Sequence, residues 1–110
     1  MQNMEWSKTE KAIVRKAFDS AYEAECQEVI TELRRMVSAA RKPGDVWTIR
    51  EYLNRKQNDI AKKYDYRYSV LIFVLARLFK EGWIKQDALK GLRLEKIEKI
   101  KFLANELYGE

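Results

Sequence analysis

Apolar residues recur with helical spacing along most of the chain, and the first such stretch is the longest. Ser7 and Glu10 have the spacing of a capping box, in which each side chain accepts the other residue's backbone N–H. Nothing after them breaks a helix before Pro43. We therefore predict one amphipathic helix from Lys8 to Ala40. Its apolar stripe, at about 100° per residue, comprises Val14, Phe18, Ala21, Tyr22, Cys26, Val29, Leu33, Met36 and Ala40.

A second clear pattern is the segment Val70–Ala76, which carries no polar side chain on any face. Its β-branched residues would also suit a buried strand. The segment continues, however, through residues with cations near their end, and Gly82 can adopt the left-handed conformation that ends helices. We predict a buried helix with Asp65 as its N-terminal cap and Tyr68–Phe79 as its body.

Three shorter elements complete the predicted fold. Asp45 can cap a helix from Val46 to about Lys63, residues 87–91 are typical of a short helical turn, and residues 94–107 are typical of a last amphipathic helix. No stretch alternates apolar and polar residues as a strand would. The sequence predicts one all-α domain over residues 1–110: a long N-terminal amphipathic helix plus a compact group of shorter helices.

The length of the first helix bears on the oligomeric state. From Lys8 to Ala40 it would measure about 50 Å, whereas a compact domain of this size has a diameter of roughly 34 Å. The rest of the chain would then be too small to cover the whole apolar stripe of this helix, unless a kink folded the helix back on itself. The least demanding cover is a second copy across a two-fold axis. We expect a homodimer whose interface includes Val29, Leu33, Met36 and Val46.

Two acidic residues, Glu25 and Glu32, lie within this apolar stripe. They could pair with arginines across a dimer interface. Alternatively, the true stripe could drift along the helix and leave them at its edge. The pattern does not favour either arrangement.

Composition narrows the function classes. The chain has no histidine, which removes the commonest general base and metal ligand. Cys26 is the only cysteine, so we expect an inert buried thiol and no internal disulfide. The sequence offers no glycine-rich phosphate loop. We expect a protein that is not an enzyme and needs neither metal nor cofactor.

Hydropathy indicates where in the cell the protein is located, and charge indicates which kinds of partner it could bind. The N-terminal residues lack the pattern of a signal peptide and no run of about 18 apolar residues occurs, so we expect a cytoplasmic protein. The net charge is +5, and residues 41–67 hold eight Lys/Arg against four Asp/Glu. Such an excess is usually a solvated surface, but it could meet an acidic protein face or nucleic acid.

The most specific segment is Tyr64-Asp65-Tyr66-Arg67-Tyr68-Ser69-Val70-Leu71-Ile72-Phe73-Val74. With its continuation it closely resembles the core of the fluorescence recovery protein family. These are small all-helical dimers that act on the orange carotenoid protein of cyanobacterial photoprotection. The likeness runs from about Val46 to the end, with a weaker match in the first helix.

The resemblance also implies functional residues. The family's surface on the second helix has a tryptophan, a His-Asp pair and, six residues after the aspartate, an arginine. Here these positions fall on Trp47, Arg50 with Glu51, and Gln57. Neighbouring Lys56 or Arg55 could partly restore the missing cation. Trp47, Arg50 and Glu51 would share a helix face, unless Trp47 packs into the core instead. Phe73 and Lys99 match further family contact positions, although core packing explains Phe73 equally well.

The resemblance implies binding of the photoactivated orange carotenoid protein through its C-terminal domain. Such binding would speed the return to the resting form and end phycobilisome quenching, by population shift and without covalent chemistry. A family-like homologue with the same dimeric fold but another protein partner is the alternative, since only Trp47 is identical in the functional surface. A third reading is a DNA-binding helix-turn-helix, although its recognition helix would be the apolar segment 70–75.

Overall fold

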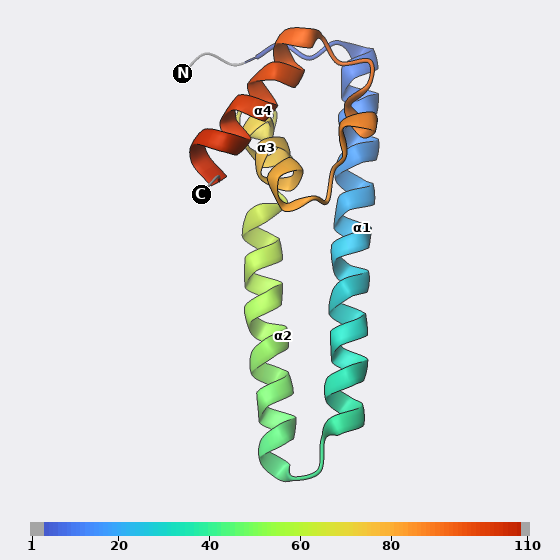
Figure 1. The fold of residues 1–110 in the computed structure, drawn as a ribbon, viewed down its shortest axis with the longest axis vertical. Coiled ribbons are helices and arrows are strands. Elements are labelled where there is room, and N and C mark those ends of the chain that lie inside the picture. Colours follow the sequence, from blue (N-terminus) through green and yellow to red (C-terminus); the bar gives the residue numbers. More distant parts are fainter. Residues whose placement is uncertain (1–3, 109–110) are drawn as a thin grey trace.

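The computed structural model describes residues 4–108, which contain helices and no strand (Figure 1). The order is α1 (Lys8–Ala39), α2 (Pro43–Lys63), α3 (Leu71–Glu81), the short 3₁₀ helix η1 (Gln86–Leu89) and α4 (Leu94–Tyr108). The predicted all-α class is confirmed.

The molecule is elongated, measuring 53 × 23 × 23 Å. Helix α1 runs its whole length without a kink, and α2 returns antiparallel beside the C-terminal half of α1 (Figure 1). We call α2 together with residues 22–39 the arm, and the remainder the head. The expectation that the chain cannot cover its own long helix is therefore wrong in part. It assumed a sphere, whereas an elongated chain can place a second helix along the first.

The core lies in the head and is centred on α3. Leu71, Leu75 and Leu78 are fully buried there, against apolar residues of α1 and α4. The segment with no polar face is thus a helix surrounded by protein. Since this is the helix that would have to read a base edge, the helix-turn-helix reading is wrong.

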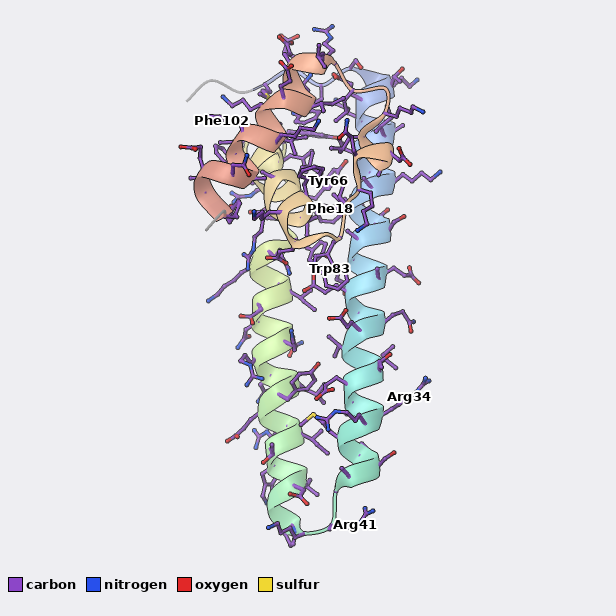
Figure 2. The ribbon with its side chains drawn as sticks, viewed as in Figure 1. Phe18, Arg34, Arg41, Tyr66, Trp83 and Phe102 are labelled. Atoms are coloured by element: carbon purple, nitrogen blue, oxygen red, sulfur yellow. The ribbon has the colours of Figure 1, made fainter. Side chains whose placement is uncertain are left out.

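The tyrosine-rich approach to α3 packs on α1. The rings of Tyr64 and Tyr66 meet the ring of Phe18 edge-on, with centroids 5.3 and 4.8 Å away. Figure 2 labels Phe18 and Tyr66 next to each other in the head. Such pairs stabilise a fold beyond the area that they bury, so this segment joins α2 to the core as well as leading into α3.

Two of the predicted helix ends are confirmed. The Ser7 hydroxyl accepts the Glu10 N–H and the Glu10 carboxylate accepts the Ser7 N–H, both at 3.1 Å, which completes the capping box. Gly82 ends α3 with a φ of +86°, a conformation that residues with a Cβ rarely adopt.

Two predicted caps are wrong. Helix α2 begins at Pro43, whose fixed φ suits a first helical position, and the Asp45 carboxylate accepts the N–H groups of Arg41 and Lys42 from inside the first turn. Asp65 binds the Arg67 guanidinium at 2.6 and 2.8 Å instead of capping α3. Helix α3 therefore starts only at Leu71, after a turn over residues 68–70.

The arm has almost no core of its own. In α2 the single buried residue is Lys63, and the large apolar side chains near the tip remain exposed: Val37 57%, Val46 52% and Trp47 61%. Among the helices of residues 4–108, none combines the length and the apolar character that crossing a bilayer requires. The exposed apolar side chains near the tip are of the kind that marks an interaction surface.

A buried ion pair ties the start of α1 to α4. Lys96 Nζ lies 2.7 Å from Glu10 Oε1 and also donates to the Glu5 carbonyl, while the Arg93 N–H donates to Glu10 Oε2. Burial alone would raise the pKa of the Glu10 carboxyl. Hydrogen bonds from Arg93, Lys96 and Ser7 outweigh burial and lower that pKa to about 2.

This pair predicts acid sensitivity. Because the folded pKa of Glu10 lies below its ordinary value of 4.5, its stabilisation is complete above about pH 4.5 and is lost as the pH falls towards 2. Between about pH 6 and pH 3 we expect the stability advantage of the native chain over Glu10→Gln to shrink by roughly 2 kcal/mol. Urea unfolding of both chains at each pH measures the difference between their free energies of unfolding. A constant advantage would contradict the assignment.

Candidate functional site

An open apolar groove runs along the arm between α1 and α2, with a volume of about 640 Å³. Leu33 and Val29 line it from α1, and Leu53 and Ile60 line it from α2. Of the expected interface residues, these two from α1 are half-buried in the groove wall, Met36 is half-buried nearer the tip and Val46 is exposed.

The residues carried over from the family resemblance are split between the arm and the head. Trp47, Arg50 and Glu51 are all exposed on one face of α2, as their spacing predicts. The possibility that Trp47 packs into its own core is wrong, because 61% of its surface is exposed. An exposed aromatic side chain flanked by opposite charges has the composition of an interface hot spot.

Lys56 and Gln57 occupy other positions around α2. Lys56 is nine residues from Trp47, about half a turn away on the helix, and it is half-buried in the groove wall. Lys56 therefore belongs to the groove and not to the Trp47 face. Gln57 is exposed and lines the edge of the groove, between the two surfaces.

Phe73 and Lys99 belong to the head. Phe73 is half-buried on α3 and packs against the core, while Lys99 is exposed on α4. In Figure 1 both helices lie above the end of α2, so the structure does not bring these residues together with the Trp47 face. A partner that touches both regions must span the arm and the head.

A charge cluster, buried at Lys63 and Glu25 and partly exposed at Glu81, joins the arm to the head. Lys63 Nζ lies 2.6 Å from Glu25 Oε2 on α1 and 2.6 Å from Glu81 Oε1 on α3. The Tyr64 hydroxyl donates to Glu25 Oε1 at 2.8 Å. Neither arrangement expected for Glu25 is therefore correct, because its partners belong to its own chain. Glu32 binds Arg35 one helical turn away on the same exposed surface.

The cluster extends into the loop after α3. Arg77 Nε and Trp83 Nε1 both donate to the Glu81 carboxylate, at 2.9 and 3.2 Å. Burial would raise the pKa of Glu81, but its hydrogen bonds to Lys63 and Arg77 lower it overall. Burial, reinforced by the bond to Glu25, raises the pKa of Tyr64. These charges are paired with one another, so they hold the arm against the head.

The sequence did not single out Lys63. Its partners lie 38 residues before it and 18 residues after it, and no short-range pattern links positions so far apart. The signal that could have found the cluster was Glu25 itself, an acid inside an apolar stripe. Buried acids are paired in folded proteins, and Lys63 follows at the end of the next predicted helix.

Comparisons with known proteins agree with this architecture. The family model described as "Photoprotection regulator fluorescence recovery protein" matches residues 6–104. The fluorescence recovery protein of Synechocystis sp. (strain ATCC 27184 / PCC 6803 / Kazusa) is 35% identical over 99 residues, which are 90% of this chain and 91% of that protein.

Solved structures give the same result. The fluorescence recovery protein of Fremyella diplosiphon aligns with a TM-score of 0.87 at 40% identity, covering 92% of this chain and 99% of its own. The Synechocystis sp. PCC 6803 structure has a TM-score of 0.87 at 35% identity, with the same coverage. Sequence and fold thus agree over nine-tenths of the chain, and the chain belongs to the fluorescence recovery protein family of photoprotection regulators.

Proposed function

We propose that this chain binds the photoactivated form of the orange carotenoid protein, at its C-terminal domain, and speeds its return to the resting form. Binding of one conformation in preference to another is sufficient for this, since a ligand shifts an equilibrium by its difference in affinity for the two states. Family membership supports a role in photoprotection. The partner and the mechanism are part of the proposal.

The exposed Trp47 face is the observation that carries the proposal. A tryptophan with 61% of its surface exposed contributes little to its own fold. It shares a face of α2 with Arg50 and Glu51, and none of the three lines the groove. Aromatic residues placed in this way are often the anchors of protein interfaces. Trp47 is also the position that this chain shares with the family's functional surface.

A homodimer through the arm groove is the second part of the proposal. The groove is apolar, and charge is segregated along α1 and the turn that follows it. Residues 17–33 hold five acidic residues and no lysine or arginine, whereas residues 34–42 hold four cations and no acidic residue. Two copies packed antiparallel would place the acidic stretch of each beside the basic stretch of the other. Opposite charges favour that orientation, and like charges disfavour a parallel one.

Co-elution tests the partner. We expect the chain to elute with photoactivated orange carotenoid protein in size-exclusion chromatography, and to do so much less with the dark-adapted form. Trp47→Ala should weaken this association at least about tenfold, because it removes the aromatic anchor. The matched control is Leu94→Ala, which truncates an apolar side chain with 68% exposure in the head. Equal binding by Trp47→Ala and Leu94→Ala would contradict the proposal.

One observation favours a different partner. Arg50, Glu51 and Gln57 depart from the family's pattern on the surface that surrounds Trp47, while the scaffold is retained. A family-like protein with another protein partner would show this combination. Failure to co-elute by a chain that remains helical and dimeric would support that alternative.

A further inference from the structure

The head contains a second cavity, separate from the arm groove. It has a volume of about 310 Å³ and lies between α1 and the segment that follows α3. Its apolar wall includes Ile13 and Ala17 from α1, and Trp83 and Ala88 from the other side. Ligand pockets in proteins start at about this volume, so the space suits a small molecule better than a protein segment.

Two local features lie beside this cavity, a glycine turn and a hydrogen-bonded indole. Gly91, just beyond η1, has a φ of +101°, and a Cβ at that position would lie 2.6 Å from Ile13 Cδ1. The positive φ favours glycine at this position, whereas the terminal methyl of Ile13 can move aside to admit a Cβ. On the opposite wall, the bond from Trp83 Nε1 to Glu81 holds the indole in place. The aromatic wall of the cavity is therefore held in place.

The rim carries charge from both sides. Lys16 reaches it from α1 and Lys90 from the loop after η1, and neither forms an ion pair with any of residues 4–108. Asp87 lies on the same rim, so the three side chains together carry one net positive charge. A single negative charge between the lysines complements this rim, whereas a second would meet Asp87.

We propose that this cavity binds a small monocarboxylate with a flat apolar body. The carboxylate lies between Lys16 and Lys90, where charge-assisted hydrogen bonds form. The apolar body lies against Trp83 and Ala17. This site is separate from the Trp47 face. The proposal of a ligand here therefore does not depend on the proposed photoprotective partner.

Titration of the ¹⁵N-labelled full chain with phenylacetate tests the proposal by NMR. We expect the amide signals of Ile13, Ala17 and Ala88 to shift with saturation below about 20 mM. The neutral isostere phenylacetamide should bind about tenfold more weakly, because it lacks the charge that the lysines recognise. The double variant Lys16→Gln/Lys90→Gln should lose about the same factor, while Lys62→Gln on the arm should change nothing.

Three results would overturn the proposal. The first is equal binding of phenylacetamide and phenylacetate, which would remove the role of charge. The second is a set of shifts confined to the arm groove, at Val29, Leu33 and Ile60. The third is the absence of saturable shifts. As a check that does not depend on charge, Ala88→Leu should fill the mouth of the cavity and abolish binding, with the spectrum still that of a folded chain.

Discussion

Replacing Lys63 by methionine is expected to lower the free energy of unfolding by about 3–5 kcal/mol. Methionine retains the length and the apolar stem of lysine but removes the ammonium that contacts Glu25 and Glu81. Glu25 is buried, so its carboxylate would remain in the interior with only the Tyr64 hydroxyl as a partner. A buried charge that has lost its counter-charge is far more costly than a missing surface pair.

Urea unfolding at one fixed protomer concentration measures this effect, because the proposed dimer would make stability depend on concentration. The matched control is Lys62→Met, the adjacent exposed lysine, which should change stability by no more than about 0.5 kcal/mol. Adding Glu25→Gln to Lys63→Met should recover part of the loss, because a neutral amide replaces the isolated carboxylate. Similar losses for Lys62→Met and Lys63→Met would contradict the role of the cluster.

Replacing Leu33 by glutamate is expected to weaken self-association by more than about 100-fold. Leu33 lines the arm groove, and the two-fold symmetry of a dimer would bury the new carboxylate twice. Each unpaired polar group costs about 1–3 kcal/mol or more when buried, and a total near 3 kcal/mol corresponds to about that factor. Light scattering coupled to size-exclusion chromatography, over a dilution series, measures the monomer–dimer equilibrium.

The control for Leu33→Glu must add the same charge to the same helix outside the groove. Gln27→Glu does so, because Gln27 is exposed and lies on the side of α1 that faces away from the groove. It should remain as associated as the native chain. If Leu33→Glu also remains associated, the second copy does not occupy this groove.

Local chemistry made much of the fold predictable. The capping box at Ser7 and Glu10 and the stop at Gly82 each depend on residues within four positions of one another. The predictions for Asp45 and Asp65 failed where two local interactions compete. Pro43 starts α2 earlier than Asp45 can cap it, and Arg67 occupies the carboxylate of Asp65. A sequence pattern does not show which of two competing local interactions is the stronger.

Long-range geometry was not predictable in the same way. The elongated shape and the Lys63 cluster depend on how α2 returns along α1, and no local signal encodes that return. The family resemblance indicated the candidate site residues, but the sequence did not indicate which of them are exposed. In the structure Trp47 is exposed, Lys56 lies in the groove wall and Phe73 packs against the core.

The dark recovery rate of photoactivated orange carotenoid protein tests the central claim most directly. Absorbance follows the return to the resting form with and without this chain, at one dimer per carotenoid protein. We predict a marked acceleration by the native chain, most of it lost in Trp47→Ala and retained in Leu94→Ala. An unchanged recovery rate in the presence of a folded, dimeric chain would contradict the claim and assign this scaffold to another partner.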